Sequence, residues 1–122
     1  MRKVLIVDDV PLNILLVKKM LTGMDCEFLT AANGEQAMQI IRDDDPDIVL
    51  LDLLMPIVDG FKVLEEVRSG NCGRKDMPIV ILSALNGSAI TRAMDLGAND
   101  YITKPIIMKH LLEVIEKIFA EK

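Results

Sequence analysis

The chain has 122 residues, of which 51% are hydrophobic, and its formal net charge is −5. This length and composition suffice for one domain with a well-filled core, which argues against a disordered protein. The negative charge argues against nucleic-acid binding, which needs a basic surface, so we expect no direct nucleic-acid partner.

Neither a membrane span nor a secretory leader is indicated by the sequence. No apolar run approaches the ~20 residues that cross a bilayer. Met1, Arg2 and Lys3 lead directly into the first apolar run, which leaves no room for a signal peptide. Cys26 and Cys72 form no Cys-x-x-Cys pair, so reduced thiols are expected. We therefore expect a cytoplasmic protein with no membrane partner.

Five short runs of apolar or β-branched residues are spaced along the chain. Three of them are continuously apolar instead of alternating, which is typical of parallel strands covered on both faces. The predicted strands are Val4–Val7, Phe28–Ala31, Ile48–Leu51, Ile79–Leu82 and Tyr101–Thr103.

The segments that follow these strands have helical periodicity. The last is the clearest, because apolar residues recur at helical spacing from Met108 to Phe119. Asn33 and Asp59 stand where side chains cap helix N-termini, and Gly97 ends the fourth pattern. The other apolar stripes lie within residues 12–21, 37–41, 60–69 and 90–94.

Strand and helix patterns alternate five times, which predicts an α/β fold with a parallel sheet and right-handed crossovers. We expect a flavodoxin-like (βα)5 three-layer sandwich with the strand order 2-1-3-4-5. No linker or repeat divides the sequence, so residues 1–122 are expected to form one domain with no output domain attached.

Charged and hydroxyl side chains stand directly after the predicted strands. Asp8 and Asp9 follow the first strand and Asp52 follows the third, while Ser83 and Lys104 follow the fourth and fifth. Carboxyl ends of parallel strands meet at one edge of the sheet, so these groups are expected to share a pocket. Charges buried there cost free energy unless an ion or partner compensates them. Oxygen ligands without His or Cys suit Mg²⁺.

This predicted pocket has the composition needed for phosphoryl chemistry. A carboxylate beside a metal ion and an ammonium group is a plausible nucleophile towards phosphorus. Catalysis would then consist mainly of positioning and charge neutralisation. The Ser83 hydroxyl is placed to donate a hydrogen bond to a phosphoryl oxygen.

Four motifs in order together resemble the receiver domain of two-component response regulators, which act in phosphorelay signalling. Each motif alone is weak, but all of them fall on predicted strand ends, and the resemblance covers the whole chain. The motifs are Val7–Asp9, Asp52–Gly60, Ser83–Ala84 and Asp100–Pro105. The resemblance implies a phosphoacceptor domain.

The resemblance implies a phosphoacceptor and a set of metal ligands. Asp52 resembles the residue that accepts the phosphoryl group and also contacts the metal. Asp9 resembles the direct Mg²⁺ ligand, and Asp8 the ligand that acts through water. The backbone carbonyl of Leu54 would complete the protein ligands.

The same resemblance implies a set of switch residues. Ser83 resembles the hydroxyl that turns towards the phosphoryl group, and Tyr101 the aromatic residue whose rotamer follows it. Lys104 resembles the lysine that pairs with phosphate. Its bond to Pro105 is expected to be cis, a geometry that only X-Pro bonds adopt at low cost.

Some of these residues have simpler explanations. Asp8 could cap the helix that begins near Pro11, and Tyr101 could be half-buried packing on an edge strand. Two segments also depart from the family pattern. The stretch from Ser83 to Lys104 is about one residue short, which affects the fourth helix, and residues 69–76 predict a long, flexible surface loop without a chemical role.

The function expected from the resemblance is a phosphorylation-controlled switch. A histidine kinase or histidine phosphotransfer protein would donate the phosphoryl group to Asp52, and the face formed by the fourth helix, fifth strand and fifth helix would dock an unknown output partner or form a homodimer. Such a domain is not an enzyme beyond catalysing its own phosphorylation and dephosphorylation.

Three other functions compete with the phosphorylation-controlled switch. A Mg²⁺-dependent phosphatase of the haloacid-dehalogenase type also uses an aspartate nucleophile, but it needs an Asp-x-Asp pattern where this chain has adjacent Asp8 and Asp9. A nucleotide-binding module is disfavoured because no glycine-rich phosphate loop occurs. A receiver relic that only binds protein is disfavoured by the complete set of acids.

Overall fold

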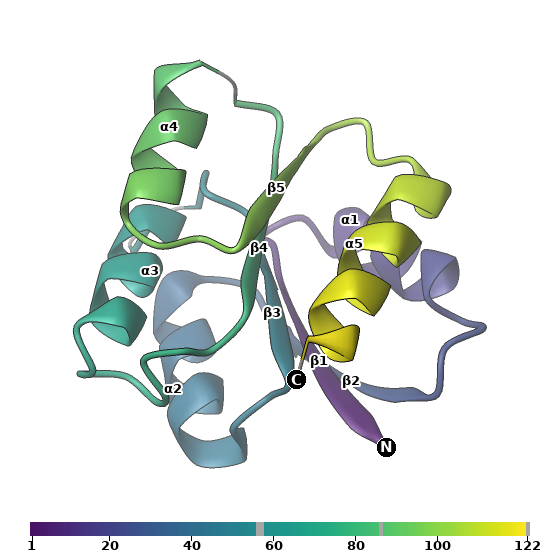
Figure 1. Ribbon diagram of the computed structural model, residues 1–122, viewed down its shortest axis with the longest axis horizontal. Coiled ribbons are helices and arrows are strands. Elements are labelled where there is room, and N and C mark those ends of the chain that lie inside the picture. Colours follow the sequence, from purple (N-terminus) through teal and green to yellow (C-terminus); the bar gives the residue numbers. More distant parts are fainter. Residues whose placement is uncertain (56–57, 86, 122) are drawn as a thin grey trace.

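The computed structural model describes residues 1–55, 58–85 and 87–121, and its strands and helices alternate along the chain (Figure 1). The strands are β1 (Arg2–Val7), β2 (Cys26–Ala31), β3 (Ile48–Leu51), β4 (Ile79–Ser83) and β5 (Asp100–Thr103). The helices are α1 (Pro11–Met20), α2 (Gly34–Asp44), α3 (Gly60–Arg68), α4 (Ser88–Asp95) and α5 (Met108–Ala120).

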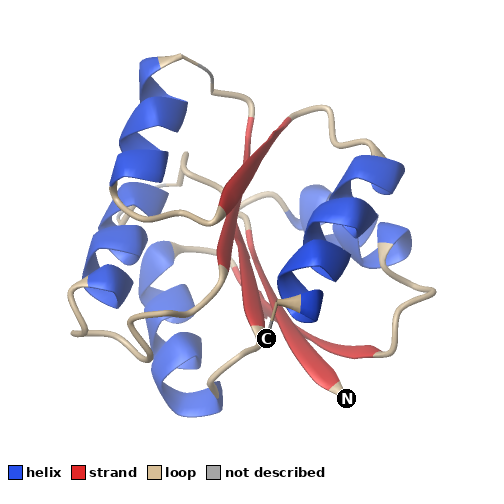
Figure 2. Cartoon of the chain, viewed as in Figure 1, coloured by secondary structure: helices blue, strands red, loops and turns tan. Residues whose placement is uncertain are grey.

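The strands form one parallel sheet in the order β2-β1-β3-β4-β5, which confirms the predicted flavodoxin-like topology. Helices α1 and α5 cover one face and α2, α3 and α4 cover the other, giving three layers (Figure 2). Because β1 lies between β2 and β3, the chain crosses the sheet in opposite directions before and after this strand. The strand order therefore reverses beside the carboxyl end of β1.

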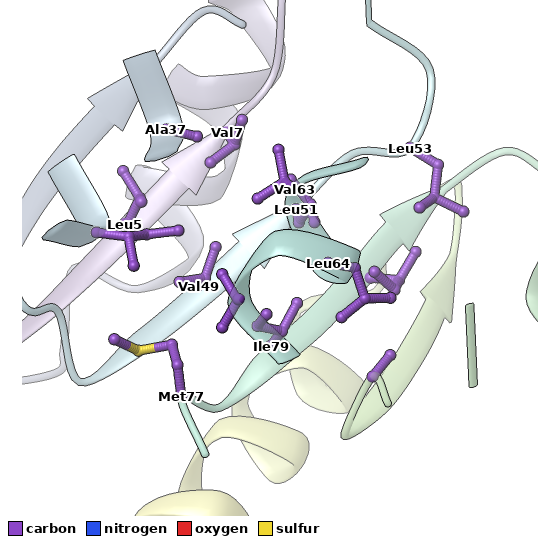
Figure 3. Packing of buried hydrophobic residues seen from close by; sticks show 14 of the residues in the cluster. Leu5, Val7, Ala37, Val49, Leu51, Leu53, Val63, Leu64, Met77 and Ile79 are labelled. Carbon is purple, nitrogen blue, oxygen red and sulfur yellow. The ribbon is translucent and has the colours of Figure 1, made fainter. Parts of the chain in front are cut away.

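Each central strand contributes to two cores because successive side chains point to opposite faces of the sheet. In β1, Leu5 packs with the α2, α3 and α4 side, while Ile6 packs with the α1 and α5 side. Figure 3 shows the first of these cores, in which Val49, Leu51 and Ile79 meet residues of α3. Burial on both faces explains why β3 and β4 are continuously apolar in sequence.

The helix starts follow the predicted caps at two positions. The Asn33 side chain accepts a hydrogen bond from the Gln36 N–H, and the Asp59 side chain accepts one from the Lys62 N–H. Asp8, in contrast, does not cap α1. The N-cap of that helix is Val10, whose N–H donates to Asp8 Oδ1 at 2.9 Å. Asp8 is thereby held just outside the helix, at the end of β1.

Helix α1 differs from the predicted single apolar stripe. Val17 is buried under the helix, but Leu12, Leu15 and Leu16 are 61%, 48% and 45% exposed. The helix is apolar around most of its circumference, so periodicity alone did not distinguish its buried side from its exposed side. No helix within the described residues has the length and hydropathy needed to cross a membrane.

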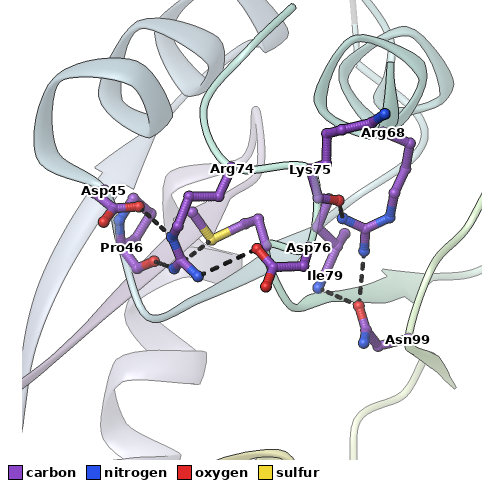
Figure 4. Close-up of polar contacts among 9 residues, drawn as sticks. Asp45, Pro46, Arg68, Arg74, Lys75, Asp76, Ile79 and Asn99 are labelled. Atoms are coloured by element: carbon purple, nitrogen blue, oxygen red, sulfur yellow. Dashed lines mark hydrogen bonds and ion pairs between the residues drawn. The ribbon is translucent and has the colours of Figure 1, made fainter. Parts of the chain in front are cut away.

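The connection between α3 and β4 contains two buried side chains and two arginine contacts to the main chain. Cys72 and Met77 are completely buried in it. Arg68 and Arg74 hold the connection through bonds to main-chain oxygens, as Figure 4 shows. Six of the eight residues 69–76 are exposed, as expected of a surface loop, but Cys72 within the segment and Met77 just after it pack into the core.

Candidate functional site

Three aspartates from two neighbouring strands lie together at the carboxyl edge of the sheet. Asp8 and Asp9 follow β1, Asp52 follows β3, and these strands pair in parallel. One carboxylate oxygen from each residue lies within 4.8 Å of the others. Asp8 and Asp52 are buried, whereas Asp9 is exposed. The pairing of β1 with β3 thus creates a concentrated negative charge that opens to solvent on one side.

Lys104 supplies a positive charge to this cluster from the end of β5. Its Nζ lies 3.2 Å from Asp8 Oδ2 and 3.6 Å from Asp52 Oδ2. The Lys104–Pro105 peptide bond is cis, as the resemblance predicted. One ammonium group faces three carboxylates here, so the cluster keeps an excess of negative charge.

The electrostatic environment of Asp52 disfavours its charged form. Burial raises the pKa of this carboxyl, and the nearby Asp8 and Asp9 raise it further, while the Leu54 N–H and Lys104 act in the opposite direction. The Leu54 N–H donates to Asp52 Oδ1 at 3.2 Å. The anion of Asp52 is therefore only partly compensated, and a bound cation would relieve the remaining repulsion.

Ser83 and Tyr101 lie on the two strands at the far side of the site from β1. Ser83 is buried at the end of β4, where its Oγ accepts a hydrogen bond from the Leu85 N–H at 3.1 Å. The Lys104 N–H donates to the Ser83 carbonyl, which ties the two strand ends together. Tyr101 on β5 is 39% exposed and pairs in register with Ile81. Its ring therefore has access to solvent.

Apolar residues follow two of the site residues in the chain. Leu54 is 57% exposed directly after the site, and Leu85 is half-buried beyond Ser83. Pro56 and Ile57, which belong to the motif that begins at Asp52, lie outside the described residues.

The donor set fits a hard divalent cation. Carboxylate oxygens converge from Asp8, Asp9 and Asp52, and no His or Cys belongs to this cluster. The excess negative charge and the raised pKa of Asp52 give a cation a favourable place to bind. A small cluster with few protein ligands suits Mg²⁺, which usually retains several waters.

Gly60, the last residue of the motif that begins at Asp52, was given no role of its own from the sequence but helps to form the site. A Cβ at this position would lie 2.5 Å from the Asp52 carbonyl oxygen and 2.8 Å from the Leu53 Cα. The first turn of α3 therefore packs directly on the main chain that carries Asp52. The Asp59–Gly60 pair was visible in the sequence. The close approach of Gly60 to the Asp52 main chain depends on the path of the loop between β3 and α3.

A family model described as the response regulator receiver domain matches residues 4–116. Among curated proteins, the chain is 39% identical over 111 residues to a protein of Porphyra purpurea named "Probable transcriptional regulator ycf27". The match covers 89% of this chain and 44% of the relative. The chain thus spans less than half the length of that relative.

Solved structures of similar proteins share the fold over nearly the full chain. The receiver domain of the Francisella response regulator 1452 is 26% identical, with a TM-score of 0.89 and coverage of 99% of this chain and 98% of that one. The receiver domain of a sensor histidine kinase from Pseudomonas aeruginosa is 27% identical, with a TM-score of 0.86 and 98% coverage of both chains. That structure is described with a magnesium ion coordinated in the active-site cleft.

Proposed function

The chain belongs to the response regulator receiver domain family of two-component signalling, and from this premise we propose that it is a phosphorylation-dependent switch with Asp52 as the phosphoacceptor. The observation that carries the proposal is the convergence of Asp8, Asp9, Asp52 and Lys104 at the carboxyl edge of the sheet. Residues 1–122 would form a phosphoacceptor domain.

Asp52 is the best candidate nucleophile among the three aspartates. It is buried beside Lys104 and the other two acids, and the Leu54 N–H orients its Oδ1. Its Oδ2 lies 3.6 Å from Lys104 Nζ and accepts no hydrogen bond from the described residues, and we assign it as the attacking atom. Asp8, in contrast, uses both oxygens, one for the Val10 N–H and one for Lys104.

The donor would be the phosphohistidine of a histidine kinase or a histidine phosphotransfer protein. The bond between phosphorus and the imidazole nitrogen breaks as the bond to Asp52 Oδ2 forms, and the imidazole leaves as a neutral group after taking up a proton from solvent. Lys104 is placed to pair with the transferred group. The domain would catalyse only this step and its own dephosphorylation.

Mg²⁺ is the cofactor that the acidic cluster would hold. We assign Asp9 as a direct ligand, Asp8 as a ligand through water, and Asp52 and the Leu54 carbonyl as the remaining protein ligands. When bound, Mg²⁺ supplies positive charge that stabilises the phosphoryl oxygens. The residues of the chain orient the acceptor and keep Lys104 close to it.

The conformational change would pass from the site to the surface through β4 and β5. Ser83 Oγ accepts from the Leu85 N–H in this structure, so its hydroxyl proton is available to a phosphoryl oxygen. A turn of Ser83 towards that oxygen would open space for Tyr101, which is partly exposed on β5. The face formed by α4, β5 and α5 would then bind an output partner or a second copy of the chain in the cytoplasm.

The assignment of Asp52 is tested by labelling with acetyl phosphate. We expect Asp52→Asn to reduce labelling to background, because the amide oxygen is a poor nucleophile, while Asp59→Asn keeps full labelling and a helix cap. Intact-protein mass spectrometry measures both. Persistent labelling of Asp52→Asn at another aspartate would contradict the assignment, and repeated turnover of small phosphate esters would favour the phosphatase of the haloacid-dehalogenase type.

A further inference from the structure

A cavity of about 440 Å³ lies beside the acidic cluster, between helix α1 and the turn that joins β5 to α5. Both helices cover the same face of the sheet (Figure 1). The floor is formed by Ile6 and Leu82 from the sheet, and the walls include Leu16, Val17 and Met20 from α1 and Ile106 beyond β5.

This cavity is a cleft that is partly open to solvent, since Leu16 in its wall is 45% exposed. Sites for small molecules typically enclose about 300–1,000 Å³ and are mostly apolar with a few convergent polar groups. The volume and the predominantly apolar lining of this cavity both match such a site.

Three polar residues also line the cavity, and two of them are already paired. Lys104 Nζ lies 3.2 Å from Asp8 Oδ2, so these two charges are paired with each other. The third is Asn13, and within the described residues its side-chain amide makes no hydrogen bond. The amide offers both a donor and an acceptor to an occupant.

We propose that the cavity between α1 and the β5–α5 turn binds an uncharged small molecule with an apolar body and one hydrogen-bonding group. The body contacts Leu16, Val17 and Ile106, and the polar group meets the Asn13 amide. An anionic ligand would be repelled by Asp8 and its neighbouring carboxylates. A charged group inside the apolar part would lose hydration without gaining a partner.

This cavity is distinct from the proposed phosphorylation site, although Asp8 and Lys104 contribute to both. The occupant would bind from the α1 side of the sheet edge, whereas the acidic cluster opens around Asp9. Binding of the small molecule can therefore be measured without any phosphoryl donor.

The test uses two dyes with the same skeleton. N-phenyl-1-naphthylamine is uncharged, has one N–H and becomes fluorescent in apolar surroundings, and 8-anilinonaphthalene-1-sulfonate adds an anionic group. We expect saturable binding of the uncharged dye with one site per chain, and binding of the sulfonate at least about tenfold weaker. Equal affinity for both dyes, or no saturable binding of the uncharged dye, would overturn the proposal.

Matched variants on the two walls locate the bound dye. Leu16→Trp should fill the cavity and weaken the uncharged dye by at least about tenfold, whereas Leu15→Trp, one residue away and equally exposed, should leave affinity unchanged. The pair Ile106→Trp and Ile107→Trp repeats the comparison on the other wall. Equal effects within each pair would mean that the dye lies on the exposed surface, which contradicts the proposal.

The polar end of the ligand is tested separately. Asn13→Ala should weaken the uncharged dye by about three- to tenfold, the usual effect of losing one hydrogen bond. Unchanged affinity would refute the role given to Asn13. Circular dichroism checks that each variant is folded, and acetyl phosphate labelling of Asp52 is measured on the same preparations. A failed dye titration and a failed phosphorylation are then separate results.

Discussion

At the scale of single residues, Asp52 combines burial with incomplete charge compensation. Burial is the main cause of its raised pKa, Asp8 and Asp9 add to the effect, and Lys104 opposes it. A carboxyl group whose pKa is raised by folding destabilises the native protein when it is ionised. The proposed phosphoacceptor therefore lowers the stability of the free domain, and a bound cation should restore it.

This cost predicts a pH-dependent effect of Asp52→Asn. Below the ordinary carboxyl pKa of 3.8 the native Asp52 is protonated and resembles the amide, so the variant should match the wild type. As the pH rises through the raised pKa, ionisation destabilises only the wild type, and the variant should become more stable.

The measurement is urea denaturation without divalent cations at about pH 4 and about pH 7. The advantage of Asp52→Asn should be larger at the higher pH. Asp25→Asn, an exposed substitution in the turn before β2, serves as the control and should show no comparable gain. A larger advantage at the lower pH would show that Asp52 is stabilised as an anion, contrary to the burial argument.

Leu54 is expected to lengthen the lifetime of a phosphoryl group on Asp52. Leu54 is 57% exposed two residues after Asp52, and its apolar side chain offers no hydrogen bond to an attacking water. Leu54→Asn should speed hydrolysis by about fivefold, which corresponds to about 1 kcal/mol of barrier. Loss of labelled protein after removal of acetyl phosphate gives the rate. Leu54→Met is the control, and slower decay in Leu54→Asn would contradict the prediction.

At the scale of elements, the arginine contacts shown in Figure 4 connect segments at the end of the sheet opposite to the site. The Arg68 guanidinium on α3 donates to the Lys75 carbonyl at 2.6 Å and to Asn99 Oδ1 at 2.9 Å. It also donates to the Gly97 carbonyl at 2.8 Å. Asn99 Oδ1 also accepts from the Ile79 N–H at the start of β4. One side chain thus connects α3, the loop before β4 and the turn after α4.

Removing Arg68 should destabilise the whole domain. Arg68→Met leaves several acceptors without their charged donor, and we expect a loss of about 2 kcal/mol in the free energy of unfolding. Urea denaturation measures it. Lys62→Met on the same helix removes only an exposed pair with Glu66 and should change stability little. Equal losses in the two variants would argue that helix α3, and not the Arg68 contacts, is responsible.

Helix α4, between Ser83 and Lys104, is the element about which the sequence was least informative. Helix α4 spans only Ser88–Asp95 and starts at Gly87 without a side-chain cap. Its Arg92 lies 4.0 Å from the centroid of the Phe61 ring on α3, and its end is held through Gly97 by Arg68. Arg92 thus joins α4 to α3, a relation that no local sequence pattern indicated.

At the scale of the whole molecule, Mg²⁺ should link the strand ends and stabilise the fold. Carboxylates from β1 and β3 share the site, so a ligand that binds only the native arrangement raises stability by mass action. At about a hundredfold excess over Kd, the gain is about 2.7 kcal/mol, which shifts the melting temperature by several degrees.

Thermal melts with Mg²⁺ and with a chelator measure this response. Asp52→Asn should show a smaller increase than the wild type because it removes one ligand and part of the negative charge. Asp59→Asn lies outside the cluster and should keep the full response. Equal increases in the wild type and Asp52→Asn would place the cation elsewhere.

The sequence by itself determined the parallel (βα)5 order, the helix caps at Asn33 and Asp59 and the strand-end positions of Asp8, Asp52 and Lys104. These features depend on local periodicity, local hydrogen bonds and the rule that parallel strands share one carboxyl edge. Strand ends were less well predicted, since β1 begins at Arg2, before its apolar run.

Only the tertiary structure decided which sides of α1 are buried, how Gly60 packs on Asp52 and how Arg68 joins distant segments. It also decided that a cavity remains between α1 and the β5–α5 turn, lined by Asn13 and Leu16. Each of these features depends on contacts between residues far apart in the chain. A sequence pattern records which residues are apolar or charged, but packing distances arise only when the layers are assembled.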